Sequence, residues 1–228
     1  VVHIDFGVEQ SFASLYSIIT GVCTGGAGFV AGKVIRKFGT PKVTFFSTLL
    51  TAVGLMGISF APNIWVMMFF TVMMGYGAGA IDTALNNYIS LHYEARHMSW
   101  LHCMWGVGAS ISPYIMSFAL VKFDHWSYGC LIIAIIQIVL STVIFTSIPL
   151  WKKGMTTDNE VAQTKSVSFK EIFTAKGAIP CFIAFFAYCS LELTASLWAS
   201  SYLVQKWELT PEAAAGFASL FYIGVTFG

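Results

Sequence analysis

The chain has 228 residues, of which 57% are hydrophobic and only 10% charged, and its formal net charge is +1. Soluble domains carry about 25% charged residues, so a water-soluble protein of this composition would expose too much apolar surface. The composition predicts an integral membrane protein whose surrounding partner is the lipid bilayer, and the small net charge suggests no nucleic-acid partner.

Long apolar runs follow one another along the chain. An α-helix needs about 20 mostly apolar residues to cross the hydrocarbon core of a bilayer. Six complete runs reach that length, at about 11–35, 43–61, 64–91, 98–121, 127–150 and 178–204, and a seventh begins near Gly216. The runs do not alternate in polarity, as the strands of a membrane barrel would. The predicted fold class is therefore all-α membrane.

A polar linker at 151–177 separates the first five runs from the sixth. If this linker is cytoplasmic, the loops at 33–42 and 92–97 are cytoplasmic too, because each span reverses the direction of the chain. Ten of the 12 Lys and Arg residues then face the cytoplasm, and only Lys122 and Lys206 lie outside. This bias follows the positive-inside rule and predicts a multi-pass cell-membrane protein.

Small residues mark one face of the first run. Gly21, Gly25, Gly28 and Gly32 recur at spacings that place them on one side of a helix. Small side chains let a second helix approach closely. We expect tight packing on this face, and motion along the same seam is a further possibility.

The first run ends in the basic turn GKVIRKFGTPK, which contains Gly32, Arg36, Lys37 and Gly39. Positive-inside charge explains its Lys and Arg but not their ordered spacing. The turn resembles the Gly–x–x–x–Asp–Arg–x–Gly–Arg–Arg motif of the major facilitator superfamily, a conformational loop between the second and third helices. Gly32, Lys37 and Gly39 fit that motif. Arg36 stands where the family usually has Asp, so the family's latch charge pair is not carried over.

The resemblance also implies a register. Family members have twelve helices in two bundles of six. Residues 1–150 would then be an N-terminal bundle holding helices 2 to 6, 151–177 a cytoplasmic linker, and 178–228 the start of the C-terminal bundle. The chain begins at Val1 and ends in an apolar run, so we expect it to be a piece of a longer protein.

The third run carries a carboxylate deep within its apolar stretch. Asp82 shares a helix face with Gly75, Gly79 and Asn86, and Asn87 flanks that face. A charged side chain at the bilayer centre costs about 2.5–3.5 kcal/mol on insertion scales. Such residues usually face a cavity, which favours a substrate or proton site. The alternative is a polar network that only joins helices.

This segment also resembles the fucose-permease type of sugar:proton symporter. That branch carries an acid followed by Thr–Ala–x–Asn, and Asp82, Thr83, Ala84 and Asn86 match in order. The resemblance implies that Asp82 couples transport to protons and that Asn86 binds sugar hydroxyls. Asn87 would then contribute a further hydroxyl ligand.

The fourth run places His102 and Trp105 one turn apart. His102 is either a ligand or proton relay, since histidine titrates near neutral pH, or a neutral packing residue. Trp105 either stacks against a sugar ring or packs between helices.

The sixth run holds the second intramembrane acid. Tyr188, Glu192, Ser196 and Ser200 line one face, and Trp198 lies further along the run. The segment resembles helix 7 of sugar-type facilitators, with its acid, Trp and Tyr, and the resemblance implies that Tyr188 and Trp198 contact the solute. Glu192 is either a site residue for protons or solute, or a structural hydrogen-bonding group.

No pattern in the sequence indicates catalysis, a cofactor or a metal site. There is no Walker-type phosphate loop and no Ser/His/Asp arrangement. The cysteines fit no metal spacing and are interpreted as small packing residues: Cys23, Cys103, Cys130, Cys181 and Cys189. The chain is therefore not expected to be an enzyme.

The sequence favours a monomeric secondary transporter that moves a small polar solute, of the sugar class, together with a proton by alternating access. Asp82 and Glu192 would act across one cavity from opposite bundles. Two alternatives remain open: a proton-antiporting drug or metabolite exporter of the same fold, and a non-transporting seven-helix receptor.

Overall fold

The structure is a computed structural model that describes residues 2–9, 11–151 and 169–227. Within these ranges the chain forms nine helices and no strand. The helices are α1 (Val2–Asp5), α2 (Phe12–Phe38), α3 (Thr40–Ser59), α4 (Ile64–His92), α5 (Ala95–Phe123), α6 (Ser127–Trp151), α8 (Phe169–Thr174), α9 (Ala178–Trp207) and α10 (Pro211–Phe227).

Six of these helices are long and apolar enough to cross a membrane, namely α2 to α6 and α9. A shorter apolar helix, Ala213–Phe227, lies within α10. The all-α membrane fold with six complete spans and a partial seventh is therefore confirmed. The helices extend a few residues past the predicted runs, because polar residues at a span end can continue the helix while their heads reach water.

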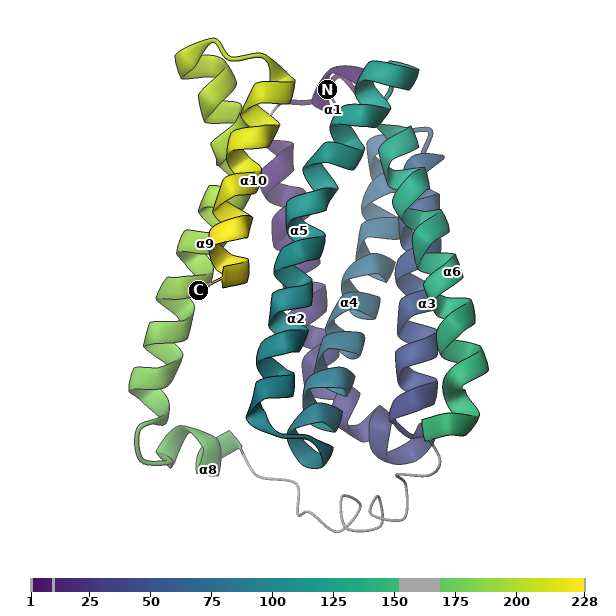
Figure 1. Ribbon diagram of the computed structural model, residues 1–228, viewed down its shortest axis with the longest axis vertical. Helices are drawn as coiled ribbons and strands as arrows, with labels where there is room; N and C mark the ends of the chain where they lie inside the picture. Colours follow the sequence, from purple (N-terminus) through teal and green to yellow (C-terminus); the bar gives the residue numbers. More distant parts are fainter. Residues whose placement is uncertain (1, 10, 152–168, 228) are drawn as a thin grey trace.

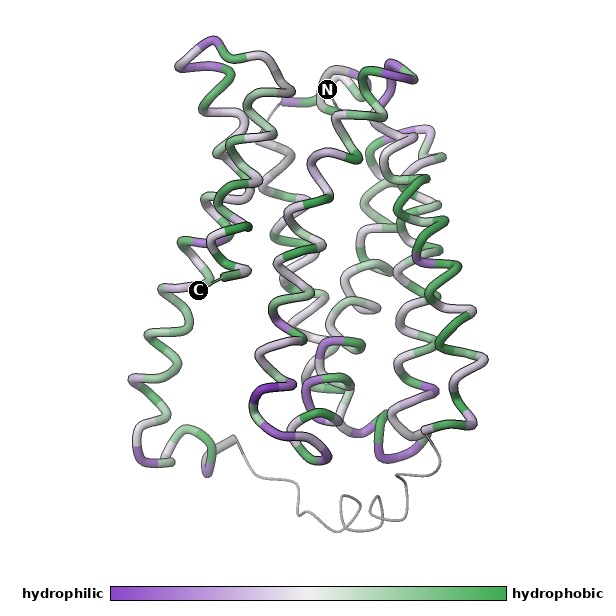
Figure 2. The backbone as a smooth tube through the Cα atoms, viewed as in Figure 1, coloured by the Kyte–Doolittle hydropathy of each residue, from purple (hydrophilic) through white to green (hydrophobic). Residues whose placement is uncertain are grey.

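The spans run alternately up and down (Figure 1). The α2–α3 and α4–α5 turns and the short helix α8 lie at one end of the molecule, and α1 lies at the other. Figure 2 shows hydrophilic residues gathered at the end that carries the α2–α3 and α4–α5 turns. This distribution is the one expected of helices whose ends, but not whose middles, meet water.

Helix α4 packs closely against α2 and α3, and its glycines make this possible. A Cβ atom added to Gly75 would lie 2.7 Å from Cys23 Cβ, and one added to Gly77 would lie 2.7 Å from Thr51 Cγ2. One added to Gly79 would overlap the backbone of Thr24. The three positions therefore set how near the helices approach.

The expected packing face of α2 matches the structure at Gly28, where an added Cβ would lie 3.5 Å from Thr83 Oγ1 of α4, but not at Gly21 or Gly25. A Cβ added to Gly21 or Gly25 would meet nothing within 4 Å. The buried residues of α2 are instead Cys23, Ala27 and Ala31 together with Ile35. Because both faces of α2 carry small residues four positions apart, residue size alone did not distinguish them.

The predicted linker at 151–177 lies partly outside the described residues. Trp151 still belongs to α6, and α8 is a helix that the polar composition did not predict. Beyond it, α9 contacts α8 and α10 and has no buried residue. Helix α10 lies between α9 and α5 and contacts both (Figure 1).

Candidate functional site

A cavity of about 670 Å³ lies where α4, α5, α9 and α10 come together. Its size falls within the roughly 300–1,000 Å³ typical of small-molecule sites. Its lining combines acids, a histidine, aromatic rings and thiols: Asp82, Ser99, Trp100, His102, Cys103, Trp105, Phe185, Tyr188, Cys189, Glu192, Val225, Thr226 and Phe227. Five residues singled out from the sequence thus meet in one space, although they come from three different helices.

Asp82 is exposed toward this cavity and is held by its neighbour on α4. Asn86 Nδ2 donates to Asp82 Oδ1 at 2.8 Å and to the Asp82 carbonyl oxygen at 2.9 Å. Asn86 itself does not line the cavity. Both side-chain hydrogen bonds of Asn86 go to Asp82, so its geometry is that of a residue that orients the carboxylate. The hydroxyl-ligand role that the resemblance implied stays a prediction.

Helix α5 supplies His102 and Trp105, both of which are exposed. The Trp105 ring lies 6.1 Å from the Tyr222 ring of α10, edge to face. His102 makes no hydrogen bond to any residue that the structure describes, so its ring nitrogens are open to a solute or to water. Both side chains are therefore able to contact a solute in the cavity.

Helix α9 supplies Tyr188 and Glu192, which lie one turn apart on the same face. Glu192 is partly exposed, and its carbonyl oxygen accepts a hydrogen bond from Ser196 Oγ at 2.6 Å. Trp198 is further along the helix, is 37% exposed and does not line the cavity. The acid therefore faces the cavity, whereas Trp198 does not.

Asn87 is also outside the cavity. Its carbonyl oxygen accepts a hydrogen bond from Ser90 Oγ at 2.9 Å, which is a contact within α4. Asn87 and Trp198 are thus two of the predicted solute ligands that the structure does not bring to the site.

Close approach of α10 to α5 completes the cavity wall. A Cβ atom added to Gly106 would meet Thr226, whose Cα would be 3.2 Å away. Small residues at such crossings let helix backbones come together. Gly106 thereby brings Val225 and Thr226 to the edge of the space.

Sequence reasoning missed several lining residues, and helical periodicity could have found them. Cys189 lies three residues and Phe185 seven residues before Glu192, so both lie on its helix face. Trp100 lies next to Ser99 at the start of α5.

The conformational-loop residues lie apart from the cavity, at the α2–α3 turn. Gly39 has φ 82° and ψ 150°, a backbone conformation that favours glycine, and its N–H donates to the Ile35 carbonyl at 2.8 Å. Arg36 and Lys37 are exposed, and Lys37 Nζ lies 5.3 Å from the Phe38 ring centre. A Cβ added to Gly32 would meet only its own helix neighbour Arg36. The backbone conformation of the turn therefore explains why residue 39 is a glycine. The conformational role of this loop stays a prediction.

No group of three or more metal-ligating side chains converges anywhere in the described ranges. All five cysteines lie in those ranges and are free. The lining of the cavity offers carboxylates, one imidazole and aromatic faces, a set suited to hydrogen bonding and proton exchange.

The family model described as Major Facilitator Superfamily matches residues 1–228. The chain belongs to this family. Its members are membrane transporters rather than enzymes, so the chain is part of a multi-pass membrane protein, as its spans predicted.

Individual relatives of this family are distant. The putative metabolite transport protein YwtG of Bacillus subtilis (strain 168) is 25% identical over 157 residues, which are 66% of this chain and 33% of the relative. The glucose/mannose transporter GlcP of the same organism is 26% identical over 129 residues, 53% of the chain and 32% of the relative. Monocarboxylate transporter 9 of Pongo abelii is 33% identical over 121 residues, 50% of the chain and 23% of the relative.

The chain thus spans about a third or less of the length of these relatives. The match to the family model confirms the predicted family. The names of the relatives include sugar and monocarboxylate transporters, and these names do not test the narrower fucose-permease branch.

Proposed function

We propose that the protein is a proton-coupled symporter for a small polar solute of the sugar class, working by alternating access. The observation that carries this proposal is the cavity in which Asp82 of α4 and Glu192 of α9 line one space with His102. Two acids from different helices are costly to keep in an apolar span, and such residues commonly serve proton or solute pathways.

The proposed coupling step uses the charge on these acids. A carboxylate that enters a low-dielectric environment holds its proton more tightly. Protonation removes the charge that would oppose closing the site, so bound proton and solute can cross together. Asn86 keeps the Asp82 carboxylate directed toward the cavity through its 2.8 Å hydrogen bond.

The aromatic and polar lining supports a hydroxylated solute. The faces of Trp105 and Tyr188 offer apolar surfaces for the C–H side of a sugar ring, while Glu192 and His102 offer hydrogen-bonding groups. A glucose/mannose transporter among the relatives agrees with this solute class. Asn87 and Trp198 do not line the cavity, so we assign them no contact with the solute.

The proposal keeps the predicted division of the chain. Residues 1–150 would form one bundle and 178–228 would begin the second, with the 151–177 linker in the cytoplasm and one monomer as the working unit. Membership in a transporter family argues against the seven-helix receptor. The exporter alternative has the same fold and differs in the direction of proton movement.

Transport by the full-length protein in proteoliposomes tests the proposal. An inwardly directed proton gradient should drive accumulation of the solute, whereas an exporter would exchange solute against protons. Asp82→Asn should abolish accumulation and spare counterflow, because the solute can still bind and exchange without a proton. Asp124→Asn is the matched control, since Asp124 is exposed at the end of α5 and lies outside the cavity. If the Asp82→Asn variant accumulates the solute as well as the Asp124→Asn control does, Asp82 does not take part in the coupling step.

A further inference from the structure

A groove of about 420 Å³ runs between α2, α3 and α4. Its wall on α2 extends from Ala27 to Phe38, a stretch over which an α-helix rises about 16 Å. Among the described residues that line the groove, Lys42 alone is charged, and almost all of the others are aliphatic or aromatic. The groove shares no lining residue with the candidate transport site.

The groove is open on one side. Val30, Phe46 and Tyr76 line it and are 54%, 62% and 46% exposed, whereas Ala31 and Val43 of the same lining are buried. The three helices that form it are all long and apolar enough to cross a membrane, so the open side meets the hydrocarbon of the bilayer.

The length of the groove matches one leaflet of that bilayer. The hydrocarbon core is about 30 Å thick, so each leaflet contributes about 15 Å. The apolar wall of about 16 Å on α2 begins at the α2–α3 turn, where the helices end, and continues toward the middle of the span. An acyl chain that enters from this leaflet can therefore lie along the whole groove.

The end of the groove at the α2–α3 turn is positively charged. Lys42 lines this end, and Lys37 Nζ lies 5.3 Å from the ring centre of Phe38, which also lines the groove. Lys33 and Arg36 are exposed on the last turns of α2. None of the ion pairs within the described part of the chain involves these four basic residues. This end of the groove therefore favours an anionic partner.

We propose that this groove binds one anionic phospholipid, with an acyl chain between α2 and α3 and its phosphate beside Lys42 and Lys37. Basic residues at the ends of membrane helices attract anionic head groups, and basic pockets between such helices bind them. The apolar wall accepts the acyl chain of any phospholipid, so the charge at its end selects the anionic ones. The binding does not rest on the proposed function and is measured without transport.

Native mass spectrometry of the full-length protein, titrated with phosphatidylglycerol and with phosphatidylcholine of the same acyl chains, tests the charged end. Phosphatidylglycerol should bind more tightly. Lys42→Gln should reduce this preference roughly fivefold, because each basic residue contributes a similar attraction to an anionic head group. Lys37→Gln should act in the same direction, and it keeps the test open if Lys42→Gln does not fold.

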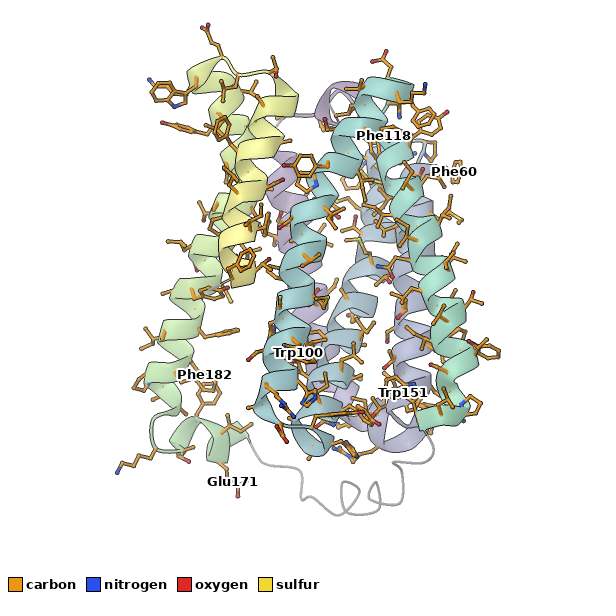
Figure 3. All side chains as sticks on the ribbon, in the orientation of Figure 1. Phe60, Trp100, Phe118, Trp151, Glu171 and Phe182 are labelled. Atoms are coloured by element: carbon orange, nitrogen blue, oxygen red, sulfur yellow. The ribbon has the colours of Figure 1, made fainter. Side chains whose placement is uncertain are left out.

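Lys176→Gln is the matched control for charge. Lys176 is exposed in the α8–α9 turn, between Glu171 and Phe182, which Figure 3 labels at the same end of the molecule as the α2–α3 turn. It does not line the groove, so the preference for phosphatidylglycerol should stay unchanged. An equal loss of preference in Lys42→Gln and Lys176→Gln would overturn the proposal, because it would show attraction to the overall charge alone.

Val30→Trp tests the acyl chain. The larger side chain would occupy the open wall of the groove, so the most tightly bound phospholipid of either kind should be lost. Val22→Trp is the control, since Val22 is 70% exposed on α2 and lies outside the groove. Lipid binding that is the same in the two variants would place the acyl chain elsewhere and overturn the proposal.

Discussion

The α3–α4 side of the molecule and the α9 side differ in how deeply their residues are buried. In α3, the hydroxyls of Thr44 and Thr48 are buried and donate to backbone carbonyls one turn earlier, at 2.9 Å and 2.8 Å. In α9 no residue is buried, and Glu192 faces a cavity. The hydroxyls of α9 also bond their own helix, since Thr194 and Ser196 donate to carbonyls one turn earlier, but they do so without being buried.

The space around the glycine residues also differs between the two sides. The glycines of α4 lie against backbone atoms of α2 and α3, where any side chain would separate the helices. Helix α9 has no glycine, and a Cβ atom added to either glycine of α10, Gly216 or Gly224, would meet nothing within 4 Å. We infer that substitutions on the α3–α4 side change stability first, and that substitutions around the cavity change transport first.

The largest effect is expected from Gly79→Ala. The added methyl group would overlap the Thr24 backbone, which cannot move without shifting α2. Overpacking of this kind costs about 1–3 kcal/mol and sometimes more. The melting temperature of the purified full-length protein in detergent should fall by several degrees. Gly25→Ala is the control, because its methyl group would enter open space. Equal melting temperatures for the two variants would show that the α2–α4 seam is not tightly packed.

Glu192→Gln should leave the melting temperature unchanged and weaken solute binding. The side chain supports no described packing, since α9 has no buried residue. Loss of a hydrogen bond from a charged acceptor costs about 1.5–3 kcal/mol, so the apparent affinity should fall roughly tenfold or more. Binding is measured by solute-dependent quenching of tryptophan fluorescence. Glu208→Gln, on the exposed residue after α9, should have no effect. If both variants bind alike, Glu192 has no contact with the solute.

A smaller effect is expected from Asn86→Ala. The change removes the 2.8 Å bond to Asp82 Oδ1 but leaves the carboxylate in place. A hydrogen bond of this kind contributes about 0.5–1.5 kcal/mol net, which corresponds to a loss of about twofold to tenfold. Proton-driven uptake should fall by that factor in the full-length protein, while Asn87→Ala should leave uptake unchanged. If uptake responds equally to the two variants, the orienting role of Asn86 is wrong.

The sequence predicted the spans well because hydropathy over some 20 residues depends little on how the helices pack. It also identified Asp82 and Glu192, since a carboxylate within an apolar run is conspicuous wherever the helix points. Asp82 and Glu192 line one cavity with His102, Trp105 and Tyr188 because α10 contacts α5. No local sequence pattern predicts that contact.

The side of each helix that faces its neighbours was the feature that the sequence predicted least well. Gly21 and Gly25 repeat at a packing period but meet nothing within 4 Å, while the neighbouring row at Cys23 and Ala27 is buried. Asn86 matched a ligand pattern, yet its two bonds go to Asp82. Both outcomes depend on the rotation of a helix by a fraction of a turn, which tertiary contacts decide.

The most direct test of the account is aqueous labelling of Asp82→Cys and Glu192→Cys. The full-length protein, with its native cysteines replaced, would be treated with a charged thiol reagent in the membrane. The account predicts that both positions react and that one solute protects both, because they line one cavity. Leu140→Cys on α6 should stay unlabelled, since Leu140 is 47% exposed on a span and lies outside the cavity. Absence of labelling at both acidic positions under every gradient would contradict the shared, water-accessible site.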